Sequence, residues 1–280
     1  MDFISRLIDI STRPVPLRAL IIRRLLKRWP IGPYRERLNA GAVDRPAYGF
    51  CLFHAAEQAK ALGFKAISAI ELGVAGGNGL IAMCRHRDEI KKALGIDVHL
   101  YGFDTGAGLP SSNDPRDVLY CWAPGSYAMD RPALEERLAE RAKLIFGNVA
   151  DTAAEWQALP DAPLGAILFD LDFYSSTTAA FKLLTCKNAL PRIWCYFDEV
   201  TGRPLQALTD YIGEREAIRQ FNLAPERSLL RDSISRAYVF ANKTPESWHD
   251  RIFLYHRLTH PAYNTLVTVN EVQQFPLNPE

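Results

Sequence analysis

The chain has 280 residues, 48% of them hydrophobic, which is enough for one large buried core with appendages. Its formal net charge of +1 gives no overall field that would favour nucleic acid as a partner. No uninterrupted apolar segment reaches the length of a membrane span, and the N-terminus has no signal-peptide core. Five scattered cysteines without a CxxC pair indicate reduced, buried thiols, so we expect a soluble, cytoplasmic protein.

Positive charge is concentrated at the N-terminus. Residues 1–39 hold nine Lys or Arg and three acids, a net charge of +6 that leaves −5 for the rest of the chain. Residues 16–29 (PLRALIIRRLLKRW) place apolar side chains at helical spacing with arginines between them, which predicts a basic amphipathic helix. Such a helix could attach to an anionic membrane surface, or pack on its own domain or on a second copy of the chain in a homo-oligomer. We expect a helical N-terminal extension or lid (1–65), a core (66–245) and a C-terminal tail packing on it (246–280).

A glycine-rich stretch begins the predicted core. Residues 66–72 (AISAIEL) form a short apolar run that predicts a strand buried on both faces. The run ends in Glu71 and Leu72, and glycines at 73, 76, 77 and 79 lead into a helical pattern. Strand, glycine turn and helix build the nucleotide pocket of open α/β sheets, because glycine lets the backbone bend tightly and approach a ligand. The same pattern also occurs as a plain tight turn, so its meaning depends on the residues at the ends of the later strands.

The next predicted strand, 97–103 (DVHLYGF), is followed by Asp104. A carboxylate at this strand tip can accept hydrogen bonds from both hydroxyls of an adenosine ribose, or it can cap the turn before Thr105. Asp104 lies 27 residues after Gly77, further than in a nicotinamide fingerprint, which argues against a dehydrogenase. Residues 105–131 form a long loop with embedded aromatics, which we expect to cover or line the site unless the aromatics plug an edge of the core.

Three further apolar stretches predict strands, at 143–146, 164–171 and 192–197. The first of them is followed by Asn148 and Val149, where polar and backbone groups could meet an adenine edge. The remaining pattern predicts helices at 132–141, 177–190 and 204–221 and a closing strand at 236–240.

The second and third of these strands deliver pairs of acids, Asp170 with Asp172 and Asp198 with Glu199. Open parallel sheets bind ligands at their strand ends, and four converging carboxylates would repel one another unless a cation lay among them. Oxygen ligands without nearby Cys or His suit Mg²⁺, Mn²⁺ or Ca²⁺ rather than zinc. Individually, any of these acids could instead cap a helix or pair with an arginine.

Taken together, these motifs resemble those of the class I S-adenosylmethionine-dependent methyltransferases. More narrowly, they are similar to the macrocin O-methyltransferase family, which methylates sugar hydroxyls in antibiotic biosynthesis. Residues 71–77 (ELGVAGG) are similar to the first motif of that family, and residues 104–110 (DTGAGLP) to its Asp-Ser-Phe-Glu-Gly-Leu-Pro segment. Residues 170–177 (DLDFYSST) follow its Asp-x-Asp-x-Tyr-x-Ser-Thr run. The resemblance covers about residues 66–240, and we expect an α/β fold with a doubly wound, mostly parallel seven-stranded sheet.

The resemblance implies a set of cofactor-binding residues: Glu71, Gly73, Gly77, Asp104, Asn148 and Val149. Within this set, Glu71 and Gly73 would hold the methionine end of S-adenosylmethionine and Asp104 its ribose. Asn148 and Val149 would lie beside the adenine.

The resemblance also implies that Asp170, Asp198 and Glu199 bind Mg²⁺ (or Mn²⁺), with Asp172 as the general base or a further ligand. Asp170 and Asp172 are therefore the predicted catalytic residues. The spacing of 28 residues between the acid pairs also resembles the metal site of catechol O-methyltransferases. Two positions depart from the patterns of these families. The sugar enzymes carry Asp-Asp where this chain has Asp198 and Glu199. Catechol enzymes place a lysine base where this chain has Phe173. A sugar or other polyol acceptor is thus favoured over a catechol.

The expected function is a Mg²⁺-dependent O-methyltransferase acting on a hydroxyl of a small molecule, with no nucleic-acid partner. An aliphatic hydroxyl is so weakly acidic that a cation to lower its pKa and a carboxylate to take its proton are both plausible requirements. One alternative is a non-catalytic methyltransferase-fold partner or membrane-surface module that acts through the basic N-terminal helix. Another keeps the fold but changes the chemistry, as in metal-dependent hydroxylase relatives.

Overall fold

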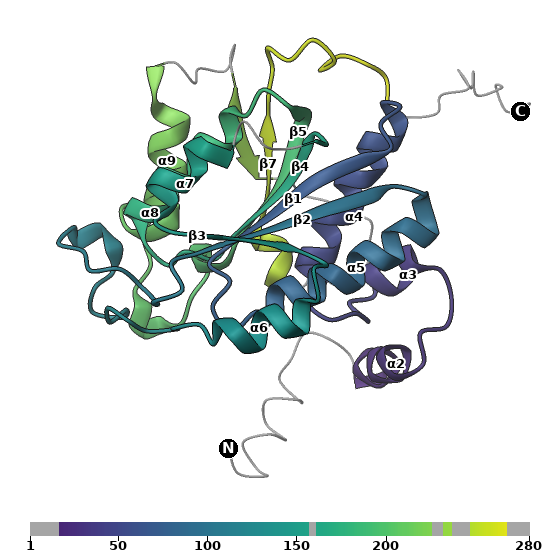
Figure 1. Ribbon diagram of the computed structural model, residues 1–280, viewed down its shortest axis with the longest axis horizontal. Coiled ribbons are helices and arrows are strands. Elements are labelled where there is room, and N and C mark those ends of the chain that lie inside the picture. Colours follow the sequence, from purple (N-terminus) through teal and green to yellow (C-terminus); the bar gives the residue numbers. More distant parts are fainter. Residues whose placement is uncertain (1–16, 157–160, 226–231, 237–246, 268–280) are drawn as a thin grey trace, which may run out of the picture.

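A computed structural model describes residues 17–156, 161–225, 232–236 and 247–267. Within these residues one sheet has the strand order β3-β2-β1-β4-β5-β7-β6 (Figure 1). Strand β7 pairs antiparallel with both β5 and β6, and every other neighbouring pair is parallel. The predicted doubly wound, mostly parallel seven-stranded α/β fold is confirmed. The strands are β1 (Ala66–Leu72), β2 (Asp97–Asp104), β3 (Lys143–Phe146), β4 (Leu164–Phe169), β5 (Ala189–Phe197), β6 (Ser233–Arg236) and β7 (Ile252–His256).

The central strands are apolar because helices cover both faces of the sheet. All of β4 and all but the first residue of β1 are buried. From β1 the chain winds outward through β2 and β3, then returns to β4 on the other side of β1 and winds the opposite way. The strand order therefore reverses between β1 and β4, and this switch point is where open sheets form a ligand crevice at the carboxyl ends of the strands.

Helices form a layer on each side of the sheet (Figure 1). One layer includes α4, whose side chains Tyr48, Phe50 and Phe53 belong to the same buried cluster as Ile67 of β1. Residues that precede the first strand thus form part of the core beside the sheet. The α-helices described are α2 (Leu17–Arg28), α3 (Tyr34–Asn39), α4 (Pro46–Ala61), α5 (Asn78–Leu94), α6 (Arg131–Leu138), α7 (Val149–Trp156), α8 (Tyr174–Ala180) and α9 (Gly213–Leu223).

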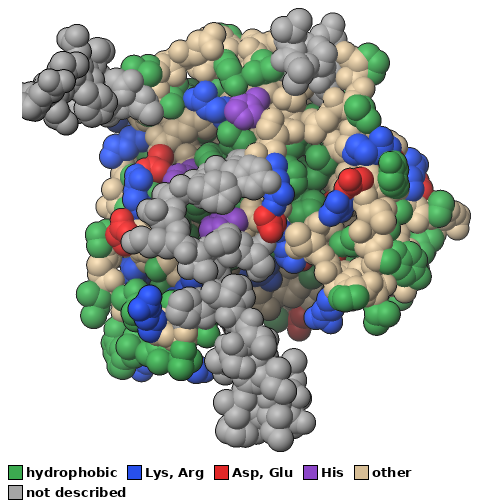
Figure 2. Space-filling view, turned by 180° about the vertical axis from the view of Figure 1, so that it is seen from behind, with side chains coloured by type: hydrophobic (Ala, Val, Ile, Leu, Met, Phe, Trp, Pro, Cys, Tyr) green, Lys and Arg blue, Asp and Glu red, His purple; other side chains and the backbone are tan. Residues whose placement is uncertain are grey.

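Helix α2 differs from the others, because none of its residues is buried. It lies at the edge of the molecule beyond α3 (Figure 1). Seen from behind, the corresponding corner carries hydrophobic and basic side chains next to one another (Figure 2). The sequence correctly predicted this helix.

The two predicted helices at 177–190 and 204–221 are wrong in extent. The first begins early, at Tyr174, ends at Ala180 and continues only as the 3₁₀ turn Phe181–Thr185. The second begins only at Gly213, and the segment before it forms just the 3₁₀ turn Pro204–Gln206. Leu205 in that segment is 90% exposed, so no packing on the core stabilises a helix there.

The sheet also ends differently from the expectation. The described strand β6 covers 233–236, and 237–240 lie outside the described residues. Strand β7, which was not predicted from the sequence, comes from the C-terminal segment and lies between β5 and β6. Its apolar run IFLYH is the signal that could have revealed it.

All five cysteines are free, and four of them are buried, as predicted. No helix in the described part of the chain is long and apolar enough to cross a membrane.

Candidate functional site

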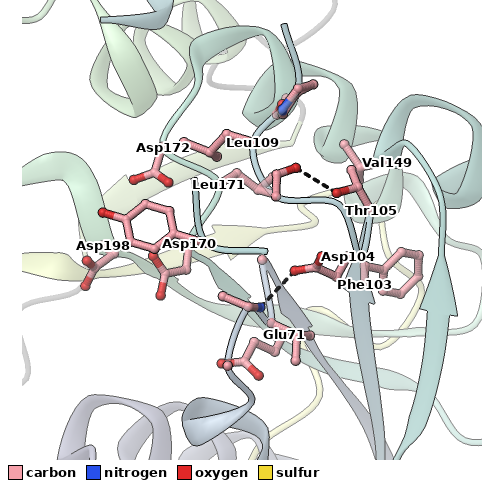
Figure 3. A pocket seen from close by; sticks show the side chains of 18 of the residues that line it. Glu71, Phe103, Asp104, Thr105, Leu109, Val149, Asp170, Leu171, Asp172 and Asp198 are labelled. Carbon is pink, nitrogen blue, oxygen red and sulfur yellow. Dashed lines mark hydrogen bonds between the residues drawn. The ribbon is translucent and has the colours of Figure 1, made fainter. Parts of the chain in front are cut away.

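A cavity of about 380 Å³ lies at the switch point, at the carboxyl ends of the strands (Figure 3). Its lining includes every residue that the sequence singled out for a site: Glu71, Gly73, Gly77, Asp104, Asn148, Val149, Asp170, Asp172, Asp198 and Glu199. The fold thus brings together positions spread over more than a hundred residues of sequence. The role of each residue stays a prediction.

The glycine turn after β1 is required by close packing. Gly73 has φ of +82°, and a Cβ atom there would lie 1.9 Å from the carbonyl oxygen of Asp170. Gly77 has φ of +79°, and its Cβ would lie 2.1 Å from a methyl carbon of Leu134. A side chain at either position would be strained in its backbone and would meet occupied space. The turn therefore fixes the backbone of the cavity wall and holds the end of β1 against the end of β4.

Asp104 joins this turn to the loop after β2. Its Oδ2 accepts a hydrogen bond from the Ala75 N–H at 2.8 Å (Figure 3), and its Oδ1 accepts one from the Gly106 N–H at 2.6 Å. Asp104 therefore caps the turn that follows β2, which is one of the two roles that the sequence allowed for it. Each carboxylate oxygen has a second lone pair, so the same side chain can still accept a bond from a ligand in the cavity.

Glu71 is a buried acid with an oxygen that lacks a partner. Burial raises its pKa to about 8, and the neighbouring Asp170 adds to this shift. Among the described residues, no hydrogen-bond donor reaches its Oε2. A buried polar atom without a partner calls for an explanation, and a cationic group of a ligand in the cavity would provide one.

Asp170 and Asp172 follow β4 and enter the cavity from its opposite side (Figure 3). Burial raises the pKa of Asp170 to about 7 and that of Asp172 to about 8, with repulsion from neighbouring acids as the second cause. Asp172 has φ of +60°, a left-handed conformation that is uncommon for a residue other than glycine. Backbone strain of this kind gathers at functional sites.

The second acid pair is held by partners from other parts of the chain. Asp198 accepts hydrogen bonds from Tyr196 and from Arg251, and Arg251 comes from the segment just before β7. Glu199 accepts a hydrogen bond from Gln206 at 2.9 Å. Its backbone N–H donates to the fully buried Glu214 at 2.8 Å.

The fit to a divalent cation is therefore mixed. Four carboxylates around one cavity form an oxygen-only donor set, which suits Mg²⁺ or Mn²⁺ in kind. In the part of the chain that the structure describes, however, no three acidic, His or Cys side chains lie close enough together to hold one ion. Arg251 already supplies a positive charge beside Asp198. Metal binding by these acids consequently stays a prediction.

One cavity residue that the sequence did not reveal is Arg45, just before α4, and Tyr48 in the first turn of that helix links it to Asp170. Arg45 has its guanidinium 4.9 Å from the centre of the Tyr48 ring and donates to the Tyr48 hydroxyl at 3.1 Å. That hydroxyl in turn lies 3.5 Å from Asp170 Oδ2. No local motif marks these residues, because only the packing of α4 on the sheet brings them to the cavity.

The long loop after β2 contributes Trp122 and Tyr127 to the cavity wall. Asp117 anchors this loop, because it is fully buried and accepts hydrogen bonds from both the N–H and the hydroxyl of Ser175 in α8, at 2.8 and 2.7 Å. The loop therefore lines the cavity, as expected, and its aromatic residues Trp122 and Tyr127 do not plug an edge of the core. Aromatic side chains in its sequence were the signal for this role.

Neither a protein-family model nor a curated protein matches this chain. Among solved structures, the chain is similar to the calicheamicin methyltransferase CalS11, at 20% identity over 91% of both chains with a TM-score of 0.49. It is also similar to the O-methyltransferase TomG from Streptomyces achromogenes in complex with SAM, at 15% identity over 92% of this chain and 99% of that one, with a TM-score of 0.43. An O-methyltransferase from Bacillus cereus in complex with SAH shares 14% identity over 88% of this chain and 92% of that one, with a TM-score of 0.40.

Proposed function

We propose that this chain is an S-adenosylmethionine-dependent methyltransferase that methylates a hydroxyl group of a small molecule, with a sugar or polyol-like natural product as the favoured acceptor. The observation that carries the proposal is that the cavity at the switch point has two chemically different sides. On one side lie the glycine turn and Asp104, and on the other lie the acids that follow β4 and β5. A nucleoside cofactor suits the first side, and a hydroxyl that must lose a proton suits the second.

The cofactor side fits the parts of S-adenosylmethionine. The unpartnered Oε2 of Glu71 would accept a hydrogen bond from the α-ammonium group, and the backbone of Gly73, which lines the cavity, would lie against the methionine end. Asp104 would accept bonds from the ribose hydroxyls. Asn148 and Val149, at the start of α7, would lie against the adenine. When bound, this cofactor supplies an electrophilic methyl group on a sulfonium.

On the acid side, the residues position the acceptor and take its proton. Methyl transfer is an in-line displacement, so the acceptor oxygen must be aligned with the methyl carbon. Trp122 and Tyr127 offer flat surfaces against which a sugar ring or other acceptor can lie. Asp172 is the residue that we assign as general base, because its carboxylate enters the cavity from a left-handed backbone position beside the other acids.

A divalent cation forms the finer part of the proposal. Mg²⁺ at this site would be held by Asp170, Asp198 and Glu199, and it would lower the pKa of the acceptor hydroxyl. The oxygen-only donor set supports this assignment. The ion pair between Asp198 and Arg251 opposes it, because a cation would have to share or displace that arginine. The metal requirement is therefore tested separately from the cofactor.

Thermal unfolding with S-adenosylhomocysteine tests the proposal first. At a hundredfold excess over its dissociation constant, a ligand of the native state adds about 2.7 kcal/mol to the free energy of unfolding. We expect a clear rise in Tm with S-adenosylhomocysteine and none with NADH at the same concentration. Transfer of a labelled methyl group to a panel of sugars and polyols, with catechol as the comparison, then tests the acceptor class. An unchanged Tm would instead support a non-catalytic role for the fold.

A further inference from the structure

Helix α2 presents an apolar face to solvent. Its outward side carries Ile21 and Leu25, which are 52% and 49% exposed, together with Leu17 at 60%. Two large apolar residues follow the helix, Trp29 at 56% and Ile31 at 74% exposed. In a helix, residues 17, 21 and 25 lie on one side because they are spaced by four. The exposed apolar side chains therefore share one side of the helix with Arg18 and Arg28, and we call this apolar set the α2 face (Leu17, Ile21, Ile22, Leu25 and Trp29).

The α2 face is surrounded by positive charge. The helix contains five basic residues and no acid. Arg18, Arg24 and Arg28 are exposed and make no ion pair with any residue that the structure describes. Figure 2 shows the same mixture of hydrophobic and basic side chains at the corner of the molecule where α2 lies. Exposed apolar surface and unpaired basic side chains on the same helix are the features of a helix that lies in a membrane interface.

The inner side of α2 is fixed to the rest of the molecule. Lys27 forms an ion pair with Asp44 at 3.8 Å, and the guanidinium of Arg23 lies beside Gly41. Leu20 and Leu26 on the same side are half-buried. The contacts to the protein and the exposed apolar face are therefore on opposite sides, and the helix can meet a partner without leaving its place in the fold.

We propose that the α2 face docks on an anionic membrane surface. Long arginine side chains beside and between the apolar residues can reach the lipid headgroups while Ile21, Leu25 and Trp29 enter the apolar boundary. The proposal does not depend on methyl transfer, because none of these residues lines the cavity. The rest of the chain outside residues 1–39 carries a net charge of −5, so attraction to an anionic surface is confined to this end of the molecule.

A second copy of the chain fits the α2 face less well. Two such helices facing each other would bring their basic side chains together, and like charges in contact repel. The helix has 12 residues and is thus about 18 Å long and about 10 Å wide, far smaller than the roughly 800 Å² that each partner buries in a stable interface. A lipid surface has neither difficulty, because it supplies negative charge and continues beyond the helix.

Co-sedimentation of the full chain with vesicles tests the proposal. One set of vesicles is phosphatidylcholine alone, and the other also contains phosphatidylglycerol. We expect binding to the anionic vesicles, little binding to the neutral ones, and loss of binding at high salt. The triple variant R18Q/R24Q/R28Q should bind on the order of a hundredfold more weakly, because each basic residue near an anionic surface strengthens binding about fivefold.

Two further variants separate the sources of binding. I21Q/L25Q should also weaken vesicle binding while keeping the Tm of the parent, since no residue of α2 is buried. The control K60Q/K65Q/K187Q removes the same charge from exposed positions elsewhere and should bind the vesicles like the parent. Equal binding of R18Q/R24Q/R28Q and the parent would overturn the proposal. A second outcome would also overturn it. If the parent does not bind anionic vesicles and elutes as a dimer, and I21Q/L25Q elutes as a monomer, the α2 face is an interface between copies.

Discussion

The two sides of the cavity satisfy their charges in different ways. On the cofactor side, Asp104 has backbone N–H partners at both carboxylate oxygens, supplied by the turns that it joins. On the acid side, burial raises the pKa of Asp170 to about 7 and that of Asp172 to about 8, and the acids repel one another. On the first side, only Glu71 among the described residues keeps a carboxylate oxygen without a partner. The second requires protons or a positive charge, and Arg251, which pairs with Asp198, and Arg45 supply part of that charge.

The largest expected effect is on the acid side. We expect D172N to lower the rate of methyl transfer by about 10²–10⁴-fold, the usual contribution of a general base, while binding of S-adenosylhomocysteine changes little. Single-turnover kinetics with labelled cofactor measure the rate, and calorimetry measures the binding. A variant that keeps the rate of the parent would remove Asp172 from the chemistry.

The glycine turn allows a matched pair of variants. G73A should lower the free energy of unfolding by about 2–5 kcal/mol, because its Cβ would meet the Asp170 carbonyl and its φ is positive. G76A is the control, since a Cβ there has open space, and its effect should stay within about 0.5 kcal/mol. Urea unfolding of both proteins gives the comparison, and equal stability would show that the close approach of β1 and β4 is relaxed in solution.

Asp104 should have a double effect if it holds both the turns and the ribose. D104A leaves the N–H groups of Ala75 and Gly106 without their acceptor and should cost about 1–3 kcal/mol of stability. Affinity for S-adenosylhomocysteine should fall about 10- to 100-fold, with Mg²⁺ binding unchanged. Calorimetry at a temperature where the variant is fully folded separates the two effects. Unchanged affinity would leave Asp104 with the turn alone.

Replacing Glu71 should raise stability at high pH but weaken cofactor binding. In the unfolded chain its carboxyl ionises near pH 4.5, whereas in the folded protein the pKa is about 8. The contribution of Glu71 to stability therefore falls as pH rises through this window, by up to about 1.4 kcal/mol per pH unit. E71Q should remove this share of the pH dependence and stabilise the protein at pH 8 without ligand.

The same E71Q variant should bind S-adenosylhomocysteine about tenfold more weakly, since a neutral amide replaces the carboxylate that faces the ammonium group. E135Q on the exposed side of α6 is the control and should change neither property. A pH profile of E71Q that matches that of the parent would show that Glu71 is not the buried acid that titrates in this range.

The smallest expected effect concerns the competition between Arg251 and a cation. R251Q releases Asp198 from its ion pair, so Mg²⁺ affinity should rise severalfold. R215Q, which disrupts the exposed pair with Asp210, should leave Mg²⁺ affinity unchanged. Weaker Mg²⁺ binding in R251Q would mean that the arginine helps to build the acid site rather than competing for it.

How far the sequence could predict this site depends on how each side is built. Glu71, the glycines and Asp104 lie within short motifs at strand ends, and their spacing alone brought them into one predicted pocket. Arg251 and Arg45 could not be found in this way. Arg251 reaches Asp198 only because β7 inserts beside β5, and Arg45 reaches the cavity only because α4 packs on the sheet. The fold class followed from alternating apolar strands and helices, whereas the start of α9 depended on burial that no local pattern reveals.

Calorimetric titration of S-adenosylhomocysteine into the full chain, once with Mg²⁺ and once with EDTA, tests the central claim most directly. Because the residues assigned to the cofactor are separate from those assigned to the metal, we expect saturable binding in both conditions. Mg²⁺ should add a separate heat that D198N abolishes. Absence of binding in both conditions would contradict the assignment of the cavity to this cofactor, and with it the proposal that the chain transfers methyl groups.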